Sequence, residues 1–388
     1  MDGGKKSSLE ARLIITPNHE RRDHEEEEEE GGWFIVREEI LEEGKKQVVL
    51  AGPLIAVSLL QYCLQVISIM FVGHLGELPL SSASLATSFA SVSGFSVLTQ
   101  SVVVPMVMIY GFTALLHVPV CWVLVFGLGM GSRGAAVANG VSNWVNVVLL
   151  WAYVTLSPDC AKTWTGFSRE GLDDVVGFLK LAVPSAFMIC LEYWSFEMVV
   201  LLSGLLPNPQ LETSVLSVSL NTCWMVYMIS VGLGGAISTR VSNEMGAGRP
   251  QGARLALCVM VVVAVVEGAV VGTGTILVRH LWGKLYCNEE EVISYVAKMM
   301  PLLALSDFLD GFQCVLSGAA RGCGWQNLCA FINLGAYYVV AIPSAVLFAF
   351  VLHIGGMGLW MGIICGLSVQ VIALVTVNLF TDWELEAS

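Results

Sequence analysis

The sequence has little charge and long stretches with none. Only 13% of its 388 residues are Asp, Glu, Lys or Arg, 55% are hydrophobic, and no such charged residue occurs from Leu78 to Ser132. The mean hydropathy of +0.73 exceeds what a water-facing surface allows. These absences exclude an ordinary soluble domain, and we predict an integral membrane protein.

The signature motifs of several enzyme and cofactor classes are also missing. The sequence contains no GxxxxGK[ST], HExxH or GxSxG motif, and its eleven cysteines include no CxxC pair. Gly129, Gly131 and Gly134 spell GxGxxG, but no strand precedes them, so we interpret them as close helix packing. We therefore expect no enzyme, no cofactor and no metal site, with the cysteines serving as packing residues.

Charge is concentrated in the first 46 residues. This tail holds 14 acidic and 8 basic residues, and the whole chain has a formal net charge of −13. An acidic tail argues against nucleic acid as a partner. We expect residues 1–46 to be partly disordered, particularly the run Glu25–Glu30, and Trp33–Gln47 to form an amphipathic helix on the membrane surface.

From Gln47 onward, apolar segments alternate with short polar breaks. Only helices or closed barrels satisfy their backbone in lipid, and these segments are too long for barrel strands. The pattern predicts an all-α polytopic membrane protein with ten helices near 47–72, 80–98, 101–126, 134–156, 176–203, 212–236, 255–278, 292–320, 329–352 and 357–380.

The distribution of Lys and Arg predicts the orientation. With a cytoplasmic N-terminus, most of the basic loop residues lie inside, and only Arg133, Arg279 and Lys284 lie outside. The positive-inside rule therefore places both termini in the cytoplasm. The stretch 238–254, with three arginines on the cytoplasmic side, reads as a loop that serves as a gate or hinge, or that only reflects this rule.

The chain contains an internal repeat with an offset of 131 residues. Pro53 matches Pro184, and the register also aligns Tyr62 with Tyr193 and Gly73 with Gly204. Two copies of one unit are a common plan for secondary transporters, whose site lies between the copies.

The first copy is shorter than the second. Both end in the sequence GMG, at 129–131 and at 356–358, yet Pro53 to Gly129 spans 76 residues and Pro184 to Gly356 spans 172, a difference of 96. The gap falls in GFSVLTQSVVVPM, 94–106, where one expected span meets the next without a turn.

Carboxylates inside the spans are the candidate functional residues. A charge at the bilayer centre costs roughly 2.5 to 3.5 kcal/mol, so such residues usually face a cavity or carry protons or cations. Glu192 lies near the middle of its span, with Gln61 as its counterpart in the first copy, while Glu197 points about 140° away around the helix.

Asp307 and Asp310 stand three residues apart on one helix face. Desolvation favours the neutral form of a carboxyl, so such groups can hold or release protons. The alternative is that they stay protonated and only bond neighbouring helices; we favour the functional role for Glu192 and Asp310 and the structural one for Glu197 and Asp307. The stripe continues through Gln313, Cys314, Ser317 and Arg321.

Aromatic residues lie close to these acids in the sequence. They suit a flat-walled cavity for aromatic or cationic solutes, although Trp and Tyr also anchor helices at the membrane interface. The residues are Tyr193, Trp194, Trp224, Tyr227, Tyr337 and Tyr338.

Several of these stretches together resemble a known family. KLAVPSAFMICLEYWSFE, LLPNPQLETSVLSVSLNT, STRVSNEMGAGRP, CNEEEVISYVAKMMPLLALS, DGFQCVLSGAARGCGWQ and HIGGMGLWMGIICGLSVQ are similar to the plant DETOXIFICATION branch of the multidrug and toxic compound extrusion family. The likeness extends from about residue 37 to the end.

This resemblance implies an antiporter of two six-helix lobes that exchanges protons for organic solutes, such as plant secondary metabolites or xenobiotics, across the vacuolar or plasma membrane. Glu192 matches the family's essential glutamate and Asp310 its acidic partner, so these two are the expected proton-coupling residues. The candidate substrate contacts are Gln61, Tyr193, Glu197, Asn221, Asp307 and Tyr338.

The departure from the family lies at the junction of Leu98 and Thr99. Family members continue there into two further helices, so the resemblance places their third and fourth helices in the gap. The expected organisation is a cytoplasmic tail (1–46), a shortened N-terminal lobe of four helices (47–156), a loop (157–175), a C-terminal lobe of six helices (176–380) and a second tail (381–388). Two alternatives are a transport-inactive form that binds full-length partners, and a membrane-embedded enzyme, which the missing motifs disfavour.

Overall fold

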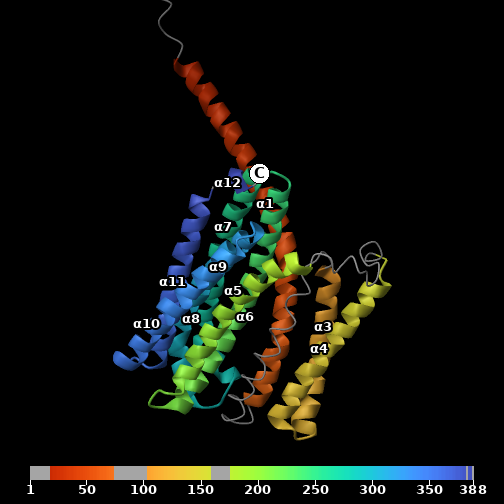
Figure 1. The fold of residues 1–388 in the computed structure, drawn as a ribbon, viewed down its shortest axis with the longest axis vertical. Helices are drawn as coiled ribbons and strands as arrows, with labels where there is room; N and C mark the ends of the chain where they lie inside the picture. Colours follow the sequence, from red (N-terminus) through yellow and green to blue (C-terminus); the bar gives the residue numbers. More distant parts are fainter. Residues whose placement is uncertain (1–17, 74–102, 159–174, 382, 387–388) are drawn as a thin grey trace, which may run out of the picture. The chain divides into compact units, whose positions relative to one another are not determined.

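The computed structural model describes residues 18–73, 103–158, 175–381 and 383–386 (Figure 1). Every regular element in these ranges is a helix, and the chain divides into two compact units, Met1–Lys46 and Gln47–Ser388. The elements are α1 (Asn18–Gly73), α3 (Val103–Trp122), η2 (Val123–Gly127), α4 (Gly131–Leu156), α5 (Val175–Ser203), α6 (Pro209–Gly246), α7 (Pro250–Trp282), η4 (Gly283–Leu285), α8 (Glu290–Gly322), α9 (Gln326–Asn333), η5 (Leu334–Ala341), α10 (Ile342–Val346), η6 (Leu347–Val351), α11 (Gly356–Phe380) and α12 (Trp383–Glu386).

Nine stretches within the described ranges are long and apolar enough to cross a membrane. They correspond to nine of the ten expected spans, and the tenth, 80–98, lies outside the described residues. The span expected over 329–352 is built from α9, η5, α10 and η6, in which α-helical and π-helical turns alternate. The all-α fold is confirmed.

Helix α1 includes both the acidic run Glu25–Glu30 and the stretch Trp33–Gln47. The partial disorder of the tail and the position of Trp33–Gln47 on the membrane surface stay predictions. Glutamate has a high helix propensity, so the helix extends through the acidic run.

The expected loop 238–254 is mostly helical. Helix α6 continues to Gly246 and α7 begins at Pro250, which leaves only the turn 247–249 between them. The turn is possible because Gly248 adopts φ +68°, a conformation that a glycine enters without steric cost. Proline at the start of α7 suits the first turn of a helix, where its missing N–H leaves no hydrogen bond unmade.

Helix α8 lies at the centre of the C-terminal helices. It packs against α6, α7 and α11, while α5 packs against α6 and α9. Helix α1 runs beside α6 and approaches it closely at Gly232, where an added Cβ would lie 2.7 Å from the backbone nitrogen of Ile55. Small residues permit such close contact, which drives helix association in lipid.

The helices before residue 157 are joined by buried polar contacts. His117 on α3 exchanges hydrogen bonds with Ser68 on α1 (3.0 Å) and Ser142 on α4 (2.9 Å). One turn away, Thr113 donates to Asn146 on α4 at 2.6 Å. These contacts hold α1, α3 and α4 together, although the expected second span is outside the described residues.

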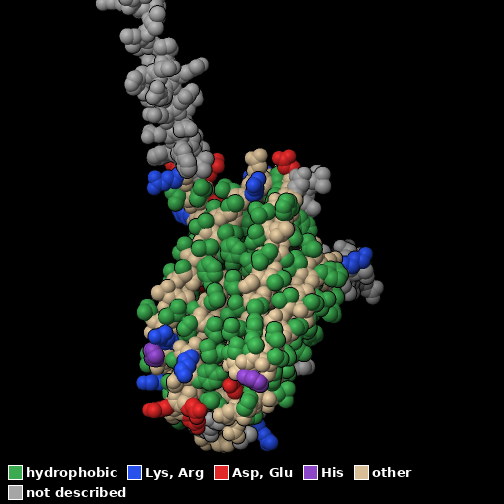
Figure 2. Space-filling view, turned by 90° about the vertical axis from the view of Figure 1, so that its left-hand side faces the viewer, with side chains coloured by type: hydrophobic (Ala, Val, Ile, Leu, Met, Phe, Trp, Pro, Cys, Tyr) green, Lys and Arg blue, Asp and Glu red, His purple; other side chains and the backbone are tan. Residues whose placement is uncertain are grey.

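The surface of the second unit has the polarity of a membrane protein. Figure 2 shows hydrophobic side chains over the middle of one face and charged side chains gathered toward its two ends. Large apolar side chains are exposed on many helices, for example Trp144 on α4 and Leu277 on α7. Such a band fits contact with lipid.

Candidate functional site

The two acids that the sequence singles out are both buried. Glu192 on α5 is 4% exposed and Asp310 on α8 is 2% exposed. Pro184, eight residues before Glu192, lies inside α5, and a proline there removes one backbone hydrogen bond of the helix. The structure thus places both carboxyls inside the packed helices rather than toward lipid.

Gln313 joins the two carboxyls. Its amide nitrogen donates to Asp310 Oδ1 at 2.8 Å and to Glu192 Oε1 at 3.1 Å. Gln313 lies one turn beyond Asp310 on α8, as the polar stripe predicted, but the sequence did not show that Glu192 shares its amide. One uncharged donor group therefore serves two ionisable groups from different helices.

The network extends to helix α11 through neutral side chains. Gln313 Oε1 accepts from Ser317 (3.1 Å) and from Gln370 on α11 (3.0 Å). Gln370 also donates to Asn333 (2.8 Å), which donates to the Met188 carbonyl on α5 (3.0 Å). The carboxyl pair is thereby held from four helices, α5, α8, α9 and α11.

The pair has no close cation within the described ranges. No Lys or Arg nitrogen there forms an ion pair with Glu192 or Asp310 within 4 Å; Arg321, about three turns from Asp310 along α8, acts on Glu192 only at longer range. Two buried carboxylates without a counter-ion would repel each other in a low dielectric. The arrangement is chemically suited to holding at least one proton.

Asp307 is buried beside this network but does not join it. It is 6% exposed, and neither of its side-chain oxygens has a hydrogen-bond partner. The shared helix face expected for Asp307 and Asp310 therefore does not give them a shared contact. Glu197 is half-buried on another side of α5 from Glu192, as their spacing predicts.

The aromatic residues fall into two groups. Tyr193 stacks on Trp224 of α6 with ring centroids 4.1 Å apart and planes 8° apart, and Tyr227 packs edge-on against Trp224 at 5.3 Å. Trp194, by contrast, is 55% exposed, which fits a membrane-facing anchor and not a cavity wall. Tyr337 is buried in the same cluster.

The remaining candidate substrate contacts are spread over three elements. The side chain of Asn221 on α6 donates to the Ser217 carbonyl (2.8 Å) and accepts from the Tyr62 hydroxyl of α1 (3.3 Å). Gln61 on α1 and Tyr338 on η5 are both partly exposed. Asn221 thus bridges α6 and α1 by a hydrogen bond, whereas among the described residues no hydrogen bond links Gln61 or Tyr338 to the carboxyl pair.

The sequence did not single out Gln370 or Asn333 as partners of the site, or Ser306 as the partner of a buried tryptophan. Each is a polar residue inside an apolar span, and that is the signal by which it could have been found. Ser306 accepts from the indole of the fully buried Trp360 at 3.0 Å. In the described part of the chain, no three His, Cys, Asp or Glu side chains are grouped to hold a metal ion.

Comparisons with known proteins agree on one family. A family model described as MatE matches residues 53–102 and 184–347, together more than half of the chain. The chain is 50% identical over 438 residues to Protein DETOXIFICATION 16 of Arabidopsis thaliana, covering 90% of each, and 46% identical to Protein DETOXIFICATION 15, covering 89% of the chain and 90% of that protein.

Solved structures of such transporters have the same fold. The crystal structure of the eukaryotic MATE transporter AtDTX14 superposes with a TM-score of 0.82 at 38% identity, covering 90% of this chain and 98% of that one. A mutant of the Vibrio cholerae MATE transporter VcmN superposes with a TM-score of 0.70, covering 89% of this chain and 99% of that one; at 12% identity it supports the fold alone.

Proposed function

The chain belongs to the MATE family of multi-pass membrane transporters and is not an enzyme, and we propose that it is a proton-coupled antiporter of organic solutes. In this proposal it removes xenobiotics or secondary metabolites from the cytoplasm, across the vacuolar or plasma membrane, and both termini are cytoplasmic. It uses the proton gradient and no cofactor.

The observation that carries the proposal is the amide of Gln313 between two buried carboxyls. A neutral amide can donate to both acids whether they are ionised or protonated, so the site tolerates a change in proton number without losing its geometry. A salt-bridged carboxylate would be held in its ionised form instead. The Glu192–Asp310 pair is therefore suited to gaining and losing a proton during a transport cycle.

Proton and solute would compete for this pair. A cationic solute favours the ionised carboxyls, whereas protonation removes the charge that attracts it, so the two bind in alternation. Tyr193 follows Glu192 on α5 and stacks on Trp224 of α6, and this pair of rings offers an aromatic face for a planar or cationic solute. Glu197, Asp307, Asn221, Gln61 and Tyr338 are proposed as further contacts.

We also propose that the N-terminal lobe lacks the equivalent of two family helices. The repeat places the gap at 94–106, of which residues 94–102 lie outside the described residues. The alignments with the relatives support the gap, because they extend over 438 residues although this chain has only 388. The comparisons give no support to the alternative of a transport-inactive form.

Transport by the purified chain in vesicles tests the function. We expect an imposed pH gradient to drive accumulation of a fluorescent organic cation, and Glu192→Gln and Asp310→Asn each to abolish the gradient-dependent part. Glu38→Gln, which removes an exposed acid of the tail, is the matched control and should transport normally. Gradient-driven flux that is unchanged in both site variants would overturn the coupling mechanism, and no flux in the folded unmodified chain would overturn the function.

A further inference from the structure

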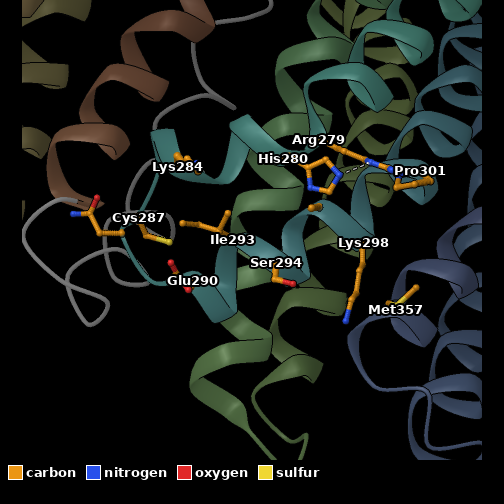
Figure 3. Close-up of a pocket in the computed structure, with 12 residues that line it drawn as sticks. Arg279, His280, Lys284, Cys287, Glu290, Ile293, Ser294, Lys298, Pro301 and Met357 are labelled. Carbon is orange, nitrogen blue, oxygen red and sulfur yellow. Dashed lines mark hydrogen bonds between the residues drawn. The ribbon is translucent and has the colours of Figure 1, made fainter.

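A second site lies at the opposite end of α7 from the α6–α7 turn. A pocket of about 970 Å³ is lined by the end of α7, by η4 and by the first turns of α8 (Figure 3). Its lining contains four nitrogen-bearing basic side chains, those of Arg279, His280, Lys284 and Lys298. We propose that this pocket binds an anionic phosphate group.

The concentration of positive charge is unusual for this chain. Of its 19 Lys and Arg residues, eight lie in residues 1–46 and three line this one pocket. Glu290 is the single acidic residue in the lining. Among the described residues, no carboxylate forms an ion pair within 4 Å of Arg279, Lys284 or Lys298. The lining of the pocket thus has a net positive charge, and Glu289 and Glu291, which flank Glu290 in the sequence, are not part of it.

The positive charge of this pocket is not explained by the expected orientation of the chain in the membrane. The expected orientation places this end of α7 away from the cytoplasm, where the positive-inside rule disfavours Lys and Arg. The charge of Arg279 and Lys284 there therefore calls for another cause than orientation, and an anionic ligand provides one.

The donors suit a phosphate. Arg279 Nε donates to His280 Nε2 at 3.1 Å, the contact dashed in Figure 3, which makes that ring nitrogen an acceptor. A guanidinium has several other N–H donors, and its planar fork matches phosphate oxygens. The ammonium groups of Lys284 and Lys298 add charge that can turn toward an anion, as lysine does in many phosphate sites.

The position of Lys298 favours a phosphate carried by a lipid. Lys298 lies eight residues into α8, about 12 Å along the helix from Glu290, and is exposed. Beside the pocket on α7, Leu277 is 77% exposed and Leu281 62%, and Pro301 and Met357 give the pocket apolar walls. Arginine and lysine nitrogens beside an apolar helix surface can hold the phosphate of a lipid headgroup while its chains lie against the helices. A free phosphate would use the same nitrogens but not the apolar walls.

Binding can be measured on the purified full chain without any transport assay, so its outcome is separate from that of the proposed function. Native mass spectrometry after incubation with phosphatidylinositol or phosphatidylcholine reports the lipid retained. We expect the anionic lipid to be retained at least about fivefold better, and Arg279→Gln and Lys298→Gln each to weaken it about fivefold, as one basic residue near a headgroup typically contributes about 1 kcal/mol.

Two further variants keep the test decisive. Arg133→Gln removes an exposed basic residue on the same expected side of the membrane but outside the pocket, and it should leave retention unchanged. Glu290→Gln removes the acid from the lining and should tighten binding about two- to fivefold, a gain that a misfolded protein cannot produce.

A parallel titration with millimolar inorganic phosphate, read as thermal stabilisation, separates the two sources. Stabilisation by phosphate that is lost in Lys298→Gln, without selective lipid retention, would assign the pocket to a soluble phosphate. Equal retention of both lipids together with no stabilisation by phosphate would overturn the proposal. Equal losses of lipid retention in Arg133→Gln and Lys298→Gln would overturn it too.

Discussion

Replacing Gln313 by methionine tests whether this amide organises the carboxyl pair. Methionine has a similar length and volume but neither donates nor accepts strongly. The change removes four contacts, two donated to Asp310 and Glu192 and two accepted from Ser317 and Gln370. At about 0.6 kcal/mol for each side-chain hydrogen bond between membrane helices, the expected loss of stability is about 2 kcal/mol.

The assay is thermal unfolding of the purified protein in detergent, followed by the pH dependence of transport in vesicles. Without the shared donor, the two buried acids face each other with less stabilisation of either charge, so we expect the transport rate to fall and its pH profile to shift. Gln326→Met is the matched control, because that partly buried glutamine donates only a long hydrogen bond, 3.4 Å to the Arg321 carbonyl. Equal effects of the two substitutions, or no effect of Gln313→Met on stability and pH profile, would refute the bridging role.

Two further predictions concern packing and capping. Gly232→Ala should lower the unfolding temperature and the folded yield, because the new Cβ would lie 2.7 Å from the Ile55 backbone. Gly235→Ala is the control and should be tolerated, since the nearest atom to its new Cβ lies 3.6 Å away. Similar unfolding temperatures for both variants would contradict the close approach of α1 and α6. Glu212→Ala removes a carboxylate that accepts from the Tyr295 hydroxyl (2.9 Å) and from the backbone N–H that begins α11 (3.0 Å), so we expect a loss of about 2 kcal/mol in thermal unfolding. Tyr295→Phe removes one of the two contacts and should cost about half as much, and equal losses would show that the helix-end contact contributes nothing.

The positions of the helices could be predicted because hydropathy is a local property. Each span needs about 20 apolar residues, and the nine described spans lie where the sequence predicted them. The loop expected over 238–254 was a wrong prediction, because local hydropathy does not distinguish a polar helix from a loop. Arg240 and Glu244 are polar residues typical of a loop, yet they form an ion pair within α6 at 3.0 Å and the helix continues through them.

The sequence could predict individual residues of the site but not the contacts between them. Glu192 and Asp310 stand out because ionisable groups are costly inside a membrane, whatever their partners. Neutral Gln370 carries little insertion cost and gives a weaker signal, so its place in the network appears only once α11 lies beside α8. The sequence likewise gives no signal that Lys298 belongs to a binding site. It lines a basic pocket only because α8 packs beside the end of α7, which carries Arg279.

The sequence by itself determined that this chain is an all-α membrane transporter of the MATE family, and it singled out two acids in the second half of the chain. These conclusions rest on composition, spacing and motifs, which need no knowledge of neighbours. Only the tertiary structure decided that Gln313 is shared by Glu192 and Asp310, that Trp194 faces outward, and that four basic side chains line one pocket. Those facts depend on how each helix is rotated against the next, and that rotation is set by packing across the whole bundle.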